Sequence, residues 1–186
     1  MDRSHVGEVA INSFALVSYF SGPLAEYLTL LRKELVADCE AKAHLTILPP
    51  RPIHASAIDA GRDLALRVQD FAPIFVELGD VQIFPESRVI YVSVTNGHLE
   101  LERMHDALNA GSVAFEEPFP YHPHITLAQD LPAESIEAVL ERARAHWTSW
   151  PHPRNFVVEK LTFVQNTLEN RWLDLEDVSL AAKVAS

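Results

Sequence analysis

Two short segments of this sequence are near-copies of each other. His44 to Leu48 reads HLTIL and His124 to Ala128 reads HITLA, and the second segment begins 80 residues after the first (124 − 44). Self-similarity at a fixed separation is typical of a chain built from repeated structural units. The sequence therefore predicts two similar halves, and this constrains the fold more than composition does.

The elements predicted around each copy follow one order. Apolar residues at helical spacing indicate helices, and β-branched or aromatic runs indicate strands. The first unit is predicted as a strand (13–20), a helix (23–37), a strand (44–48), a helix (55–69) and two strands (74–84 and 89–95). Its last strand opens the second unit, which continues with a helix (97–109), a strand (123–128), a helix (132–146) and two strands (155–165 and 172–178).

This duplicated order predicts an α+β fold. We expect residues 1–186 to form a single domain of two pseudo-symmetric lobes, with two antiparallel sheets, helices on the outside and a central cleft.

Hydrophobic residues make up 48% of the chain, which is enough for a sizeable core without a disulfide or a structural metal. The single cysteine, Cys39, suits a reducing compartment, so we expect a cytoplasmic protein.

Net charge and hydropathy limit the classes of partner that this chain is expected to bind. The formal net charge of −11 argues against tight, non-specific binding of long nucleic acid, because such binding depends on neutralising many phosphates. No stretch approaches the apolar length of a membrane span, and the N-terminus lacks the pattern of a signal peptide. We therefore expect no membrane partner and no obligate protein partner, and a monomer is the simplest assembly.

The two His-x-Thr segments carry the chemistry. Residues two apart in a strand point to the same face, so each segment places an imidazole beside a hydroxyl. One imidazole can accept a proton from an attacking oxygen while the other donates a proton to a leaving oxygen. The hydroxyls of Thr46 and Thr126 can hold the phosphate oxygens as negative charge develops. The pattern predicts phosphodiester cleavage by His44 and His124, with no metal and no cofactor.

These motifs resemble those of the 2H phosphoesterases, a family that includes the 2′-5′ RNA ligase-like proteins and cyclic phosphodiesterases. The resemblance rests on His44-Leu45-Thr46 and His124-Ile125-Thr126, and the element order extends it over about residues 13–178. It implies a bilobal fold with both motifs lining the cleft. It also implies that His44 is the proton donor and His124 the acceptor.

Two departures from the family pattern leave the substrate open. The first motif continues Ile47-Leu48-Pro49-Pro50-Arg51 where ligase-like members have a Phe-Leu-Gly type ending, and Gln129 stands where they often have Arg. The expected substrate is a 2′,3′-cyclic phosphate or a 2′-5′-linked phosphodiester on a nucleotide or short RNA end. The alternatives are a non-RNA cyclic phosphate or phosphodiester metabolite, and a binding module that recognises an RNA end without turnover.

Five further residues are candidates for substrate binding. Lys42 and Arg51 flank the first motif and could meet a phosphate, although exposed basic residues are common. Phe84 could stack on a base, in a Phe-Pro-x-x-Arg-Val stretch like that of the family. Tyr121 and His122 precede the second motif. His122 and His124 form an H-x-H pair, but no third metal ligand is evident from the spacing.

Overall fold

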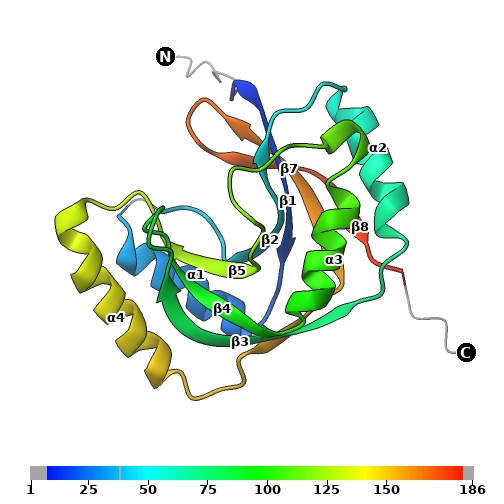
Figure 1. Ribbon diagram of the computed structural model, residues 1–186. Helices are drawn as coiled ribbons and strands as arrows, with labels where there is room; N and C mark the ends of the chain where they lie inside the picture. Colours follow the sequence, from blue (N-terminus) through cyan, green and yellow to red (C-terminus); the bar gives the residue numbers. More distant parts are fainter. Residues whose placement is uncertain (1–7, 38, 182–186) are drawn as a thin grey trace, which may run out of the picture.

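The computed structural model describes residues 8–37 and 39–181, which form two four-stranded antiparallel sheets (Figure 1). The first sheet has the order β2-β1-β7-β8 and the second has the order β5-β4-β3-β6. The strands are β1 (Ala10–Tyr19), β2 (His44–Arg51), β3 (Ile74–Ile83), β4 (Ile90–Asn96), β5 (His124–Ala128), β6 (Asn155–Val158), β7 (Lys160–Thr167) and β8 (Trp172–Ser179).

Four helices in the described part of the chain cover the sheets. They are α1 (Pro23–Leu35), α2 (Ala57–Val68), α3 (His98–Leu108) and α4 (Ile136–Ser149). Two short 3₁₀ turns, η1 (Gly111–Val113) and η2 (Ala133–Ser135), follow α3 and precede α4. Helix α1 contacts β5 and α4, and α4 contacts β3. Helix α2 contacts β8, and α3 lies between the sheets, where it contacts β2 as well as β3 and β4. Figure 1 shows the same grouping, with α1 and α4 on one side of the molecule and α2 and α3 on the other. The predicted duplicated α+β architecture is confirmed.

The two halves are interlocked by the chain. Helix α1 lies between β1 and β2 in the sequence, but it packs on the sheet that contains β5. Strand β3 follows α2 and then pairs with β4 and β6 in the second sheet, whereas β7 pairs with β1 and β8 in the first. Each half therefore depends on segments supplied by the other half.

One predicted strand was wrong. Residues 155–165 were expected to form a single strand, but they form β6 and β7, which belong to different sheets. Val158 pairs with Ile74 and Lys160 pairs with Ser179. Glu159 lies between them, and its carbonyl accepts a hydrogen bond from the Leu180 amide at 2.8 Å. An apolar run indicates burial, but it does not indicate which sheet each part of the run joins.

Local signals explain where the helices begin. Pro23 occupies the first turn of α1, where its missing N–H costs nothing. Ser56 caps α2, because its hydroxyl accepts a hydrogen bond from the Asp59 amide at 3.1 Å. Gly97 precedes α3 with a φ of 86°, and a Cβ there would meet the Phe75 carbonyl oxygen at 2.5 Å, so only glycine fits.

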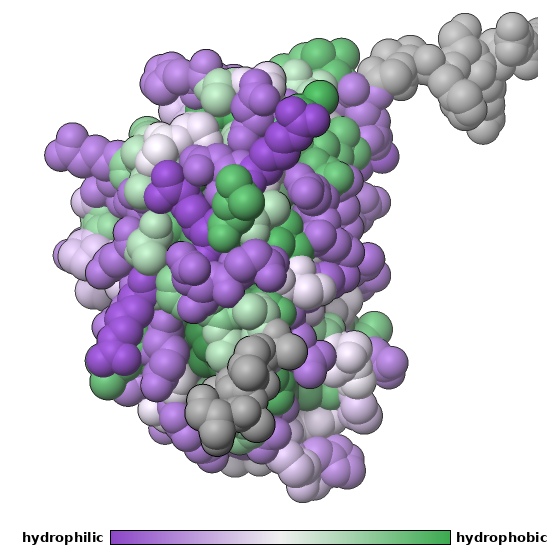
Figure 2. Space-filling model, turned by 90° about the vertical axis from the view of Figure 1, so that its right-hand side faces the viewer, coloured by the Kyte–Doolittle hydropathy of each residue, from purple (hydrophilic) through white to green (hydrophobic). Residues whose placement is uncertain are grey.

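A continuous apolar core extends through both halves and fixes the faces of β2 and β5. Leu45, Ile47, Ile125 and Leu127 are at most 1% exposed. The surface in Figure 2 is mainly hydrophilic, with apolar side chains in small groups. None of the helices within residues 8–37 and 39–181 combines the length and the apolar character that crossing a membrane requires.

Candidate active site

The two His-x-Thr segments form neighbouring edge strands. Strand β2 is at one edge of the first sheet and β5 is at one edge of the second, and the two strands contact each other. The burial pattern of β5 repeats that of the first five residues of β2: the histidine and threonine are half-buried, and the residues between and after them are buried. Both His-Thr pairs therefore lie on the strand face that the core leaves uncovered.

Both imidazoles are oriented by the same hydrogen bond. The Nδ1 atom of His44 lies 2.8 Å from the Lys42 carbonyl oxygen, and the Nδ1 atom of His124 lies 2.6 Å from the His122 carbonyl oxygen. A carbonyl oxygen can only accept, so each Nδ1 carries a proton and donates it. This fixes the tautomer and leaves each Nε2 with a lone pair for proton transfer.

Burial lowers the pKa of both imidazoles and so favours their neutral form. Burial first, and then the positive charge of Arg32, lower the pKa of His44 from 6.5 to about 4, with a smaller effect from His124. Burial also lowers the pKa of His124, and the charge of His122 adds to this effect. A nearby anion would raise both pKa values, because it favours the charged form of each ring.

The segment that leads into β5 holds β2 in place. The Tyr121 hydroxyl donates a hydrogen bond to the Thr46 carbonyl oxygen at 2.8 Å. The Tyr121 ring stacks on His105 of α3 at 4.1 Å, and His105 Nε2 lies 2.9 Å from a carboxylate oxygen of Glu117. Tyr121, a predicted substrate-binding residue, thus supports the backbone of the first motif.

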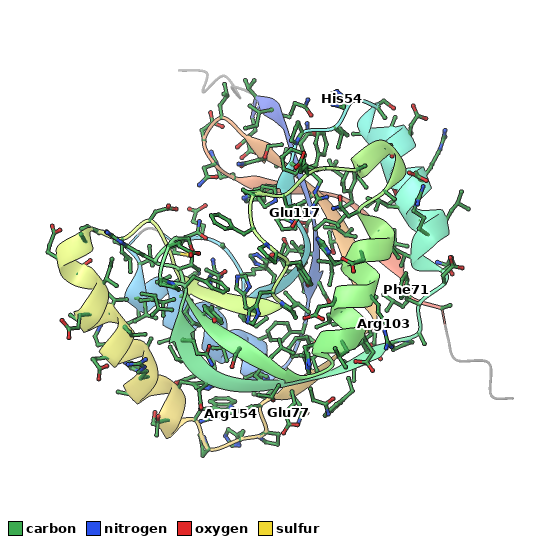
Figure 3. The ribbon with its side chains drawn as sticks, viewed as in Figure 1. His54, Phe71, Glu77, Arg103, Glu117 and Arg154 are labelled. Carbon is green, nitrogen blue, oxygen red and sulfur yellow. The ribbon has the colours of Figure 1, made fainter. Side chains whose placement is uncertain are left out.

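Arg51 is committed to contacts within the protein. It lies at the opposite end of β2 from His44 and is 2% exposed. Its guanidinium forms an ion pair with Glu117 and donates hydrogen bonds to Asn109 Oδ1 at 2.6 Å and to the Val113 carbonyl at 3.2 Å. Figure 3 labels Glu117 on the segment that crosses β2. The structure therefore does not bring Arg51 together with the two histidines.

Aromatic rings surround His124. Phe84 is half-buried and stacks on Tyr91 at 4.0 Å, and these rings meet the His124 ring edge-on at 5.1 and 5.2 Å. His122 is exposed, and its ring lies 5.5 Å from that of Phe84. No group of three His, Cys, Asp or Glu side chains in the described part of the chain is arranged to hold a metal. The structure thus brings Phe84 and His122 to the second motif and adds Tyr91.

A smaller set of groups surrounds His44. Its ring meets that of Tyr19 edge-on at 6.0 Å, and the Lys42 ammonium lies 5.8 Å from the centre of the Tyr19 ring. The Tyr19 hydroxyl lies 3.3 Å from Asp174 Oδ1, and burial together with this carboxylate raises the pKa of Tyr19 to about 12. The structure therefore places Lys42 at the site.

Sequence reasoning missed Tyr19, Tyr91 and Arg32. Tyr19 is the cross-strand partner of His44, and Tyr91 is the partner of Thr126. Both tyrosines belong to strands that the sequence predicts, so a predicted strand register would have found them. Arg32 reaches the site from α1, and no motif marks it.

The sequence of this chain is similar to those of known proteins. A family model described as the 2′-5′ RNA ligase superfamily matches residues 25–170. A Geobacillus kaustophilus protein, provisionally named a phosphoesterase, is 41% identical over 61 residues, which are 33% of this chain and 35% of that protein. A similarly named protein of another Geobacillus strain is 41% identical over 49 residues, 26% of this chain and 28% of that protein. The matches thus span about a third or less of these relatives.

Solved structures match over nearly the whole chain. A crystal structure of a phosphoesterase superposes with a TM-score of 0.61 at 17% identity, covering 94% of this chain and 99% of that one. E. coli LigT complexed with 3′-AMP has a TM-score of 0.63 at 18% identity, covering 91% and 98%. At these identities the likeness concerns the fold.

Proposed function

The chain belongs to the 2′-5′ RNA ligase superfamily, and from this premise we propose that it is a metal-independent phosphodiesterase. Its substrate is a 2′,3′-cyclic phosphate or a 2′-5′-linked phosphodiester on a nucleotide or short RNA end. His44 and His124 act as the acid/base pair, and Thr46 and Thr126 bind the phosphate. The enzyme works as a monomer in the cytoplasm.

One observation carries this proposal. The two His-x-Thr pairs lie on neighbouring edge strands with the same burial pattern, and both imidazoles donate Nδ1–H to a carbonyl. Acid/base catalysis around one phosphorus needs one neutral imidazole that accepts a proton at Nε2 and one protonated imidazole that donates a proton from Nε2, and the Nδ1–H bonds orient both rings for these roles. Structural histidines at strand ends would not require this duplicated orientation.

The reaction on a cyclic phosphate is hydrolysis. Water attacks phosphorus as one imidazole accepts its proton, the bond from phosphorus to one ribose oxygen breaks, and the other imidazole donates a proton to that oxygen. The product carries a single phosphomonoester. The threonine hydroxyls donate hydrogen bonds to the non-bridging oxygens, which gain negative charge in the transition state.

Protonation of the acid depends on the substrate. The acid role falls to His44 by family resemblance, and burial and Arg32 hold the pKa of His44 at about 4 in the free protein. A phosphodiester anion beside the ring raises this pKa, because opposite charges favour each other. Substrate binding therefore prepares the acid for its role.

A nucleotide fits the surroundings of His124. Phe84 is half-buried beside this ring and offers a surface for a base. LigT, which shares the fold, has been crystallised with 3′-AMP. These points favour a nucleotide over a phosphodiester that lacks a base.

The test is turnover of nucleoside 2′,3′-cyclic phosphates with a chelator present. We expect turnover by the native protein and by His54→Ala, in which an exposed histidine beyond the Arg51 end of β2 is removed (Figure 3). We expect a loss of about a thousandfold in His44→Ala and in His124→Ala. Near-full activity in either of these two variants would contradict the mechanism.

The same assay decides between the alternatives. Turnover of small cyclic phosphates without a base, at rates equal to those of nucleotides, would favour a metabolite as the substrate. Saturable binding of RNA ends without product, in the native protein and in the histidine variants alike, would favour a binding module.

A further inference from the structure

Arg32 is a buried cation without an ionic partner in the described part of the chain. It is 6% exposed on α1, on the helix face that also buries Leu28 and Leu35. Its Nη1 donates a hydrogen bond to the Thr126 carbonyl oxygen, while its Nε is buried and has no hydrogen-bond partner. Burying a charge is costly unless a counter-charge compensates it. Arg51, which is equally buried, has Glu117 for this purpose.

The position of Arg32 links it to both motifs. Thr29, one helical turn earlier, accepts a hydrogen bond from the Ala43 amide at 3.0 Å, and Ala43 directly precedes His44. Arg32 itself reaches Thr126 on the other strand. Helix α1 therefore contacts the start of β2 and the middle of β5, and the Arg32 guanidinium lies where the two strands approach each other.

Within residues 8–37 and 39–181, the groups that face His44 provide no negative charge to balance Arg32. They are Tyr19 from β1, Lys42 on the segment before β2, His124 from β5 and Arg32 itself from α1. Beyond them, the Asp174 carboxylate binds the Tyr19 hydroxyl. After burial, Arg32 has the largest lowering effect on the pKa of His44. A site with two imidazoles and a fixed guanidinium is suited to an anion.

We propose that Arg32 is a positioning residue of this site, which holds the Thr126 peptide in place and supplies the fixed positive charge that the phosphate group of the substrate neutralises. The proposal rests on the proposed function, because it takes phosphate as the ligand. Arg32 is not required to touch the reacting atoms. It acts through Thr126 and through the field at His44.

Three variants separate charge from hydrogen bonding. Arg32→Gln removes the charge but keeps an amide that can donate to the Thr126 carbonyl. Arg32→Lys keeps the charge but loses the planar fork. Lys33→Gln is the matched control, because it removes one positive charge from an exposed position next to Arg32 on the same helix. Histidine ring signals are followed by NMR over a pH titration, in the free protein and with inorganic phosphate.

We expect Arg32→Gln to raise the titration midpoint of His44 by about one pH unit and to weaken phosphate binding by about tenfold. Arg32→Lys and Lys33→Gln should keep both close to wild type. In turnover assays Arg32→Gln should raise KM more than it lowers kcat. Wild-type titration and phosphate affinity in Arg32→Gln would overturn the proposal. If Arg32→Gln does not fold, a raised His44 midpoint in Arg32→Lys would overturn it.

The NMR titration of His44 and the measurement of phosphate binding do not depend on turnover. If the native protein hydrolyses no cyclic phosphate but Arg32→Gln shifts the titration of His44 and weakens phosphate binding, the proposed function fails and the role of Arg32 stands. If the native protein is active but Arg32→Gln titrates and binds phosphate as wild type does, the role of Arg32 fails alone.

Discussion

The two motif strands share a pattern but have different supports. In both, the histidine donates Nδ1–H to a carbonyl two residues earlier, and the threonine is half-buried. The Thr46 carbonyl accepts its hydrogen bond from a neutral tyrosine, whereas the Thr126 carbonyl accepts its bond from the guanidinium of Arg32. Both strands are sheet edges, where carbonyl groups lack a partner strand. The duplication thus preserves the two His-Thr pairs, while the contacts that stabilise them differ.

The cross-strand neighbours of the two motifs also differ. Across the sheet from Thr126 lies Tyr91, while the equivalent neighbour of Thr46 is Val17. Across from His44 lies Tyr19, while the equivalent neighbour of His124 is Ser93. The two histidines therefore lie in different surroundings, and under the proposed function we expect the substrate to bind in one preferred direction.

The largest expected effect on stability comes from the support of β2. Glu117→Ala leaves Arg51 buried without its carboxylate, and we expect a loss of about 3 kcal/mol in the free energy of unfolding. Chemical denaturation measures it. The control is Glu141→Ala, which breaks an exposed pair with Arg144 and should change stability by less than about 0.5 kcal/mol. Equal effects of the two substitutions would contradict this role for Glu117.

The threonines test whether the two halves contribute equally. We expect Thr46→Val and Thr126→Val each to lower kcat by about a hundredfold, since each removes one donor to the developing charge. Valine keeps the shape of the side chain, so the fold should not change. Steady-state kinetics on a cyclic nucleotide provide the measurement. A loss in only one variant would show that phosphate binding belongs to one half.

The lowered pKa values predict a pH dependence of stability. His44 has a folded pKa of about 4 and an ordinary value of 6.5, so the unfolded chain binds the proton more tightly. The stability from this histidine is complete above about pH 6.5 and is lost as the pH falls towards 4. Because the ring is half-buried, we expect this loss to be about 2 kcal/mol in the free energy of unfolding. As the pH falls from 6.5 to 4, His44→Asn should lose less stability than wild type. Chemical denaturation at a series of pH values measures this, and the same pH dependence of stability in both proteins would contradict the prediction.

The aromatic side of the site should select for a base. Phe84→Ala should raise KM for cyclic nucleotides by about tenfold, because the base loses its stacking partner. It should not affect a cyclic phosphate that lacks a base. Tyr19→Phe is the counterpart on the other half, and we expect it to leave the preference between the two substrates unchanged. The same KM increase for both substrates would remove Phe84 from base binding.

The sequence predicts the two His-Thr pairs of the site but not the contacts that hold their strands in place. The repeat and the strand periodicity place each His-Thr pair on one strand face, because side-chain direction along a strand is a local property. Arg32 and the partnership of Arg51 with Glu117 depend on how α1 and the segment before β5 cross the sheets. Such contacts join positions far apart in the chain, and no local pattern encodes them. For the same reason the division between β6 and β7 was missed.

The most direct test of the central claim is a double-substitution cycle at His44 and His124. If the two imidazoles act as one acid/base pair, each single change to alanine lowers kcat by about a thousandfold, and the double change lowers it little further. The measurement is single-turnover hydrolysis of a nucleoside 2′,3′-cyclic phosphate in the presence of a chelator. Losses that multiply in the double variant would show that the histidines act independently and would contradict the account.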